Sequence, residues 1–116
     1  MLFTYEFVQL VRVKDGDTLN VIIDHGCSIF SKQTVRLGLI QAAELDSRDP
    51  LVRAEAERAK AELVRLVPVA ESFSMTTTKE REREGFGRLL ARIVLRSGLD
   101  VGATMLATGF APRYKR

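Results

Sequence analysis

The sequence predicts an α+β protein in which five short β-strands form a small barrel and two helices pack against it. Two observations predict this fold class. Short segments of alternating apolar and polar residues recur along the chain, and two other segments combine helical periodicity with clear N-terminal capping residues. The 116 residues can build one hydrophobic core but not two, so we expect a single domain over residues 1–116.

The first third of the chain is expected to contain three strands, over residues 3–14, 18–24 and 29–40. Each is rich in β-branched or aromatic residues, which favour extended structure. Asp15-Gly16 and His25-Gly26 interrupt the pattern and predict the two connecting turns. An Asp-Gly pair between strands is usually hairpin chemistry alone, and that is the simpler interpretation of the first turn.

The middle of the chain predicts a long amphipathic helix. Asp49 precedes Pro50, which is the pattern of an N-cap followed by proline at the first helical position, and Pro68 is expected to end the helix. Apolar residues recur at helical spacing on one face, at Val52, Ala56, Ala59, Leu63 and Leu66. Charged residues are expected largely on the other side, at Arg53, Glu57, Lys60 and Glu62.

The last third predicts two more strands, over residues 69–77 and 89–96, joined by a charged hairpin loop that contains residues 79–83. Asp100 is the expected N-cap of a short helix over residues 101–108, and Gly109 ends it. The resulting order, β-β-β-α-β-β-α, is typical of the OB-fold, a small Greek-key barrel of five strands.

Composition narrows the class of protein less than the motifs do. The net charge of +3 and the pI of about 9.4 indicate a mild preference for polyanions. Cys27 is the single cysteine, so no disulfide forms within the chain, and we interpret it as a strand-end thiol. We find no signal peptide and no apolar run of membrane-spanning length. We therefore expect a soluble, cytoplasmic protein with no membrane partner and no evident obligate protein partner.

Three short motifs point to phosphodiester chemistry. The turn at Asp15 and Asp17 places two carboxylates together, whereas Arg36 and Arg88 each stand in an otherwise apolar, strand-like segment. Burying an unpaired charge is costly, so arginines at such positions are expected to face a cleft and an anion. Carboxylates that face the same cleft call for a metal ion. The alternative is that the arginines are structural and pair with local acids such as Glu84.

These motifs, in this order, resemble the thermonuclease, or staphylococcal-nuclease-like, family. The similarity extends over nearly the whole chain, through residues 13–18, residues 35–37 with Glu44, residues 87–91, and residues 100–101 with 106–111. It implies a five-stranded OB barrel with packed helices. It also implies an endonuclease, or phosphodiesterase, that hydrolyses DNA or RNA with calcium, with single-stranded DNA or RNA as the substrate.

The resemblance also implies roles for individual residues. Asp17 falls on a calcium-ligand position, and Gln41 and Ala42 fall on the other metal-binding positions. Two arginines clamp the phosphate, one acidic residue orients or deprotonates the attacking water, and an aromatic side chain stacks on a substrate base. These positions are Arg36 and Arg88 for the clamp, Glu44 for the water, and Tyr114 for the stacking, with Phe86 where the family often has a substrate-contacting tyrosine.

The sequence departs from the family pattern at the metal. Gln41 replaces an aspartate and Ala43 replaces a proline, so we expect weakened calcium binding, because affinity follows the number of charged ligands. Asp15, Asp46 and Asp49 are candidates to compensate. The alternative function is a non-catalytic OB module that binds nucleic acid or a protein partner through its basic, tyrosine-containing C-terminus. On that interpretation, Glu44 belongs to the loop surface alone.

Overall fold

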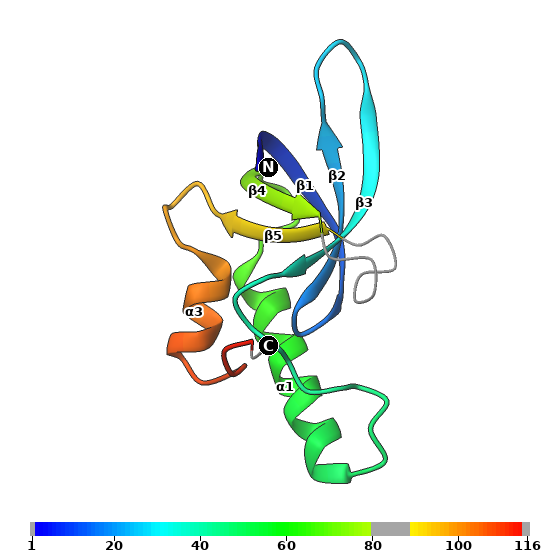
Figure 1. Ribbon diagram of the computed structural model, residues 1–116, viewed down its shortest axis with the longest axis vertical. Helices are drawn as coiled ribbons and strands as arrows, with labels where there is room; N and C mark the ends of the chain where they lie inside the picture. Colours follow the sequence, from blue (N-terminus) through cyan, green and yellow to red (C-terminus); the bar gives the residue numbers. More distant parts are fainter. Residues whose placement is uncertain (1, 80–88, 115–116) are drawn as a thin grey trace.

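The computed structural model describes residues 2–79 and 89–114. Within them, five strands and two helices follow one another in the expected order (Figure 1). They are β1 (Phe3–Asp15), β2 (Thr18–Asp24), β3 (Phe30–Leu37), α1 (Pro50–Leu66), β4 (Phe73–Lys79), β5 (Leu89–Val94) and α3 (Val101–Ala107). The strands close into a barrel in the order β1-β2-β3-β5-β4, in which β3 and β5 are parallel and the other pairs antiparallel. The predicted five-stranded, OB-like α+β fold is therefore confirmed.

The strand β1 is long because it pairs with two neighbouring strands. Its first half pairs with β4 and its second half with β2, and Val8 is paired on both sides. An irregularity between Leu10 and Arg12 leaves Val11 and Arg12 both exposed, whereas the residues on either side point into the barrel. β2 and β3 form a hairpin that extends beyond the barrel (Figure 1).

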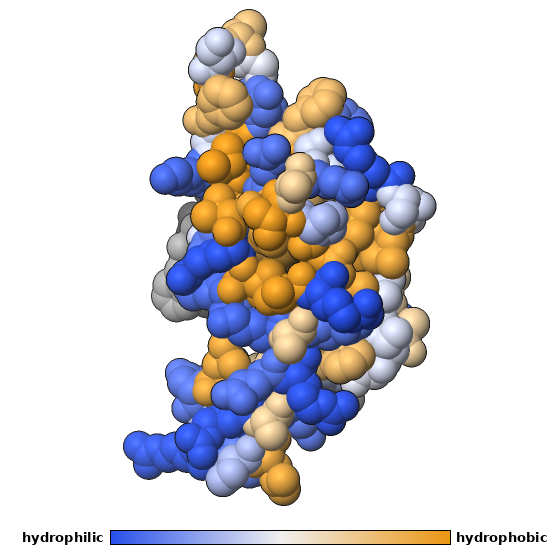
Figure 2. Space-filling view, turned by 180° about the vertical axis from the view of Figure 1, so that it is seen from behind, coloured by the Kyte–Doolittle hydropathy of each residue, from blue (hydrophilic) through white to orange (hydrophobic). Residues whose placement is uncertain are grey.

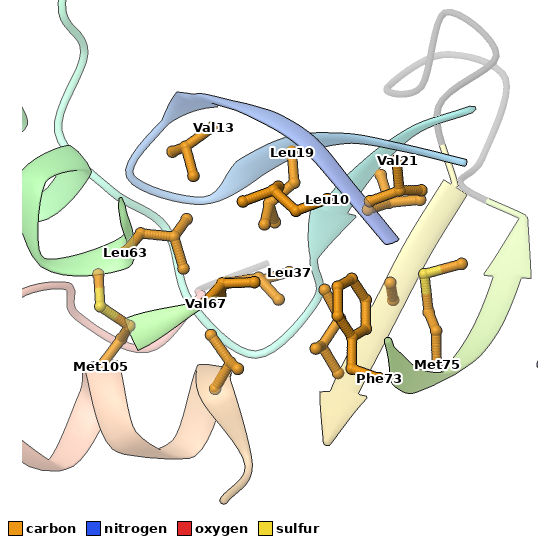
Figure 3. Close-up of a cluster of buried hydrophobic side chains, with 14 of the residues drawn as sticks. Leu10, Val13, Leu19, Val21, Leu37, Leu63, Val67, Phe73, Met75 and Met105 are labelled. Carbon is orange, nitrogen blue, oxygen red and sulfur yellow. The ribbon is translucent and has the colours of Figure 1, made fainter. Parts of the chain in front are cut away.

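The core fills the barrel with apolar side chains from every strand and is closed at one end by the two helices (Figure 3). Leu63 and Val67, in and just after α1, and Met105 from α3 are at most 1% exposed. Burying one such side chain contributes about 1.5–3 kcal/mol relative to leaving it exposed. Because α1 and α3 pack on the same end of the barrel, they hold the connections that reach that end.

The helix α1 begins and ends as the sequence predicts. The Asp49 side chain accepts a hydrogen bond from the Leu51 N–H at 2.9 Å, and the helix stops before Pro68. One expectation about its faces is wrong. Glu62 is buried rather than solvent-facing, and its carboxylate accepts two hydrogen bonds from the Arg65 guanidinium, at 2.7 and 2.6 Å, which offset the cost of burying the charge. These bonds lower the pKa of Glu62.

Three strands differ by two residues or more from their predicted bounds. β5 ends at Val94 instead of residue 96. β3 ends at Leu37 instead of residue 40, where the chain turns at Gly38 and the Gly38 N–H donates to the carbonyl of Ala91. β4 begins at Phe73 instead of residue 69, and Val69 is 69% exposed. The alternating pattern continues through residues 69–72, but in the described structure β1 pairs with β4 no earlier than Phe73. Of the predicted charged loop, only the end of β4 lies within the described residues.

The short helix α3 is capped as expected. The Asp100 carboxylate accepts a hydrogen bond from the Ala103 N–H at 3.1 Å and another from Arg92 Nε at 2.7 Å. Gly109 follows the helix with a φ of +79°, a conformation that favours glycine. No helix in residues 2–79 and 89–114 is long and apolar enough to cross a membrane.

Several large apolar side chains remain on the surface. Figure 2 shows hydrophobic residues gathered in the middle of the back face, with hydrophilic residues around them. The exposed apolar residues near the start of the chain and at the β2–β3 hairpin are Leu2, Phe3, Phe7, Val11, Ile29 and Phe30. The barrel core is built without them.

Candidate functional site at the barrel rim

Asp17 lies in the turn between β1 and β2, and its carboxylate also accepts a hydrogen bond from outside this hairpin. The side chain is only 12% exposed. Thr18 Oγ1 donates a hydrogen bond to Asp17 Oδ1 at 3.0 Å, and the backbone N–H of Ala42 donates to Oδ2 at 2.8 Å. Asp15 supports the turn by accepting a hydrogen bond from the Asp17 N–H at 3.1 Å. The contact with Ala42 joins this turn to the loop that follows β3.

Arg36 is brought to Asp17 by the pairing of β2 with β3, in which Thr18 lies opposite Arg36. The guanidinium is buried, and its Nη2 lies 3.7 Å from Asp17 Oδ2. Nη2 also donates to the carbonyl of Ile40 at 3.0 Å, and Nη1 makes a longer contact of 3.5 Å with the carbonyl of Leu37. The backbone turn after β3 therefore fixes the orientation of the guanidinium.

Tyr114 reaches the same place from the C-terminal segment, which runs beside the chain that follows β3 (Figure 1). The Tyr114 N–H donates to the carbonyl of Leu39, and the Gln41 N–H donates to the carbonyl of Pro112, both at 2.9 Å. The Tyr114 ring centroid lies 4.5 Å from Arg36 Cζ, which is within cation–π distance. Asp17, Arg36 and Tyr114, which are far apart in the sequence, thus lie together.

Gly16 permits the close approach that forms the site. A Cβ atom at this position would lie 2.7 Å from the Cβ of Ala42 and 2.7 Å from the Cβ of Ala59 in α1. Both distances are too short for carbon atoms, so the loop and the helix can touch the turn only if this residue lacks a side chain. The glycine of the Asp-Gly pair therefore has a tertiary role as well as a role in the turn.

Gly16→Ala is expected to lower the free energy of unfolding by about 1–3 kcal/mol, because the added methyl group overpacks the contact with Ala42 and Ala59. Denaturant unfolding measures this loss. Gly38→Ala is the matched control, since its Cβ would meet Leu90 at an ordinary 3.7 Å. Equal stabilities of the two variants would contradict the assigned role of Gly16.

The structure shows fewer contacts for the other predicted site residues. Glu44 is exposed in the loop after β3, and its side chain makes no hydrogen bond or ion pair with the residues that the structure describes. Gln41 is also exposed, one residue before the N–H that binds Asp17. The predicted positions Arg88 and Phe86 lie outside the described residues, so their relation to the site stays a prediction.

The electrostatics of the turn are unusual for an aspartate. The pKa of Asp17 is raised from 3.8 to about 6, chiefly by burial of the carboxyl. The neighbouring Asp15 raises the pKa further, through a side-chain hydrogen bond and charge repulsion. The Ala42 N–H and the Arg36 charge oppose these effects. Two carboxyl groups therefore share a partly buried position in which their negative charges are incompletely compensated.

This donor set fits a hard divalent cation, although it is sparse. The Asp15 and Asp17 carboxylates are the oxygen ligands that calcium prefers, and a cation would relieve their repulsion. No group of three or more histidine, cysteine, aspartate or glutamate residues in the described ranges is arranged to hold a metal ion. The remaining oxygens would come from Gln41, from the Ala42 carbonyl and from water, and weak calcium binding stays a prediction.

In metal-free protein, the stabilising contribution of Asp17 is expected to decline as pH rises. Its folded-state pKa is raised, so the contribution is complete below pH 3.8 and is lost as pH rises through about 6. The difference corresponds to roughly 3 kcal/mol at most. Asp17→Asn should remove this dependence, whereas the exposed Asp46→Asn should retain it. Unfolding in denaturant at several pH values measures both, and identical pH profiles for the two variants would refute the expectation.

A second arginine–aromatic pair lies close to the site and was not anticipated from the sequence. Arg58 of α1 places its Cζ 5.8 Å from the ring centroid of Phe110, just after α3. Phe110 belongs to residues 106–111, one of the motifs that resemble the family, but no spacing in the sequence links it to Arg58. Contacts between a helix and a distant loop of this kind have no local signal.

Comparison with protein-family models found no family that matches the chain, and comparison with curated proteins found no match either. The resemblance of the motifs to the staphylococcal-nuclease-like family therefore stays a prediction.

Proposed function

We propose that this protein is a metal-dependent hydrolase of nucleic-acid phosphodiester bonds, with calcium as the cation and single-stranded DNA or RNA as the substrate. The observation that most supports the proposal is the convergence of Asp17 and Arg36, 3.7 Å apart and both buried at the rim of an OB-like barrel. A buried guanidinium beside a carboxylate of raised pKa is typical of a functional site.

Arg36 binds the phosphate in this proposal. Two of its five N–H groups donate to backbone carbonyls, and no other described residue accepts a hydrogen bond from the rest. Tyr114 covers one face of the guanidinium, so an anion approaches along its edge, where the free N–H groups point. Because the Ile40 carbonyl already orients the guanidinium, little reorganisation is needed as negative charge grows on the phosphate.

The carboxylates and the loop after β3 provide the remaining chemistry. Asp17 and Asp15 would hold the cation, and Gln41 and the Ala42 carbonyl would supply further oxygens. When bound, calcium supplies Lewis acidity at the phosphoryl oxygen. Glu44, exposed on the same loop, is the general base for the attacking water. Arg88 is proposed as the second phosphate-binding arginine.

Cleavage of labelled single-stranded DNA and RNA tests the proposal, with calcium or with EDTA. We expect cleavage that requires calcium and that decreases in Glu44→Gln, because the amide cannot accept the proton of the water. Glu57→Gln, on the exposed face of α1, is the matched control and should cleave normally. Absence of calcium-stimulated cleavage in the unmodified protein would overturn the proposal.

A second candidate function is a non-catalytic OB module that binds nucleic acid. It is favoured by the hydrogen bonds from Thr18 and Ala42 that already occupy both oxygens of the Asp17 carboxylate, and by the neutral Gln41. Salt-sensitive binding of single strands, without turnover and unaffected by calcium, would identify this function.

A further inference from the structure

A cavity of about 210 Å³ lies between α1 and the segment that follows α3. It is lined by Ala43, Glu55, Arg58, Gly109, Phe110 and Pro112. The walls thus combine an aromatic ring, a guanidinium and a carboxylate. Among the residues that the structure describes, neither Glu55 nor Arg58 forms an ion pair, and Arg58 lies over the Phe110 ring.

The cavity and the Asp17–Arg36 site have no lining residue in common, but two segments of the chain link them. Ala43 directly follows Ala42, whose N–H binds Asp17 Oδ2, and the carbonyl of Pro112 accepts a hydrogen bond from the Gln41 N–H. Two residues after Pro112, Tyr114 lies against Arg36. The same two segments, residues 41–43 and 110–114, therefore contribute to both places.

The charges of the walls indicate which part of a nucleotide fits. A carboxylate at Glu55 disfavours a phosphate, whereas it accepts hydrogen bonds from N–H groups. The Phe110 ring offers an apolar surface next to a base, and Arg58 donates to ring nitrogens or carbonyl oxygens. These properties match the edge of a nucleobase better than the sugar–phosphate backbone.

We propose that this cavity binds a guanine base of the substrate. Guanine alone among the common bases offers two adjacent N–H donors, N1–H and N2–H, to a single carboxylate. It also offers O6 and N7 as acceptors for an arginine. Glu55 and Arg58 are three residues apart on α1 and so lie on one face of the helix, where both reach one base. The inference rests on the proposed function for the identity of the polymer.

Titration with the four ribonucleoside 5′-monophosphates, followed by calorimetry and by amide chemical shifts, tests the inference. The phosphate is common to all four, so differences between them report the base. We expect guanosine monophosphate to bind about tenfold or more tightly than the other three, and to shift the amides of Ala43, Gly109 and Phe110. Equal affinities, or shifts confined to other residues, would overturn the inference.

Variants assign the preference to the cavity walls. Glu55→Gln should lose most of the preference for guanine, and Arg58→Ala should weaken guanosine monophosphate binding by about tenfold. Glu57→Gln, two residues away on the same helix and outside the cavity, should change neither. If Glu55→Gln and Glu57→Gln behave alike, the inference fails.

The outcomes separate this inference from the proposed function. Calcium-dependent cleavage without a guanine preference in binding would contradict the inference alone. Guanine-selective binding without any cleavage would contradict the proposed hydrolase and leave the cavity assignment intact.

Discussion

Arg36→Lys is expected to lower the rate of phosphodiester cleavage by about 100- to 1000-fold, the loss typical of removing one preorganised donor to a developing charge. Lysine keeps the positive charge beside Asp17. Its single ammonium group cannot donate to the Ile40 carbonyl and bind a phosphate oxygen with the geometry of a guanidinium. We expect the loss mainly in kcat, because the interaction strengthens as charge develops on the phosphate.

The control for this experiment is Arg92→Lys. Arg92 is on β5, its side chain is 71% exposed, and it pairs with Asp100 away from the candidate site, so its rate should be unchanged. Unfolding in denaturant must accompany the kinetics, because lysine loses the hydrogen bond to the Ile40 carbonyl, and a buried acceptor left without a partner costs about 1–3 kcal/mol. A stable Arg36→Lys variant with the full rate would contradict the role of Arg36.

Gln41→Asp is expected to strengthen calcium binding by on the order of tenfold or more, and to raise cleavage at limiting calcium. The change adds a carboxylate to the loop that contacts Asp17, and calcium affinity rises with the number of charged ligands. Calorimetric titration with calcium measures the affinity. Gln41→Asn is the matched control, because it has the size of aspartate without the charge.

Two results of this experiment would be decisive. If Gln41→Asp and Gln41→Asn bind calcium equally, residue 41 is not close enough to act as a ligand. If the aspartate variant cleaves with calcium and the natural chain does not cleave at all, the natural protein is a binding module that has lost the chemistry of its metal site.

Local signals predicted most of the fold. The N-cap at Asp49, the breaker at Pro68 and the turns between the first strands act within a few residues, and the structure has the elements they predict. One error arises where tertiary contacts decide, because residues 69–72 alternate like a strand but have no strand partner in the described structure. Another concerns Glu62, which is buried in α1 with its carboxylate paired to Arg65 one turn along the same helix.

The candidate site was only partly predictable. The resemblance placed Asp17 and Arg36 together, and the pairing of Thr18 with Arg36 is the physical reason they meet. Neither the position of Tyr114 over Arg36 nor the cavity between Arg58 and Phe110 has a signal in the sequence. Both depend on how the C-terminal segment docks on the loop after β3.

The central claim is that Asp17 and Arg36 form one site that binds a cation and a phosphate together. Calorimetric titration of a nucleoside bisphosphate, with and without calcium, tests it most directly. We expect each ligand to tighten the binding of the other, and both affinities to fall in Arg36→Lys. Bisphosphate binding that is the same with and without calcium, and unaffected by Arg36→Lys, would contradict the claim.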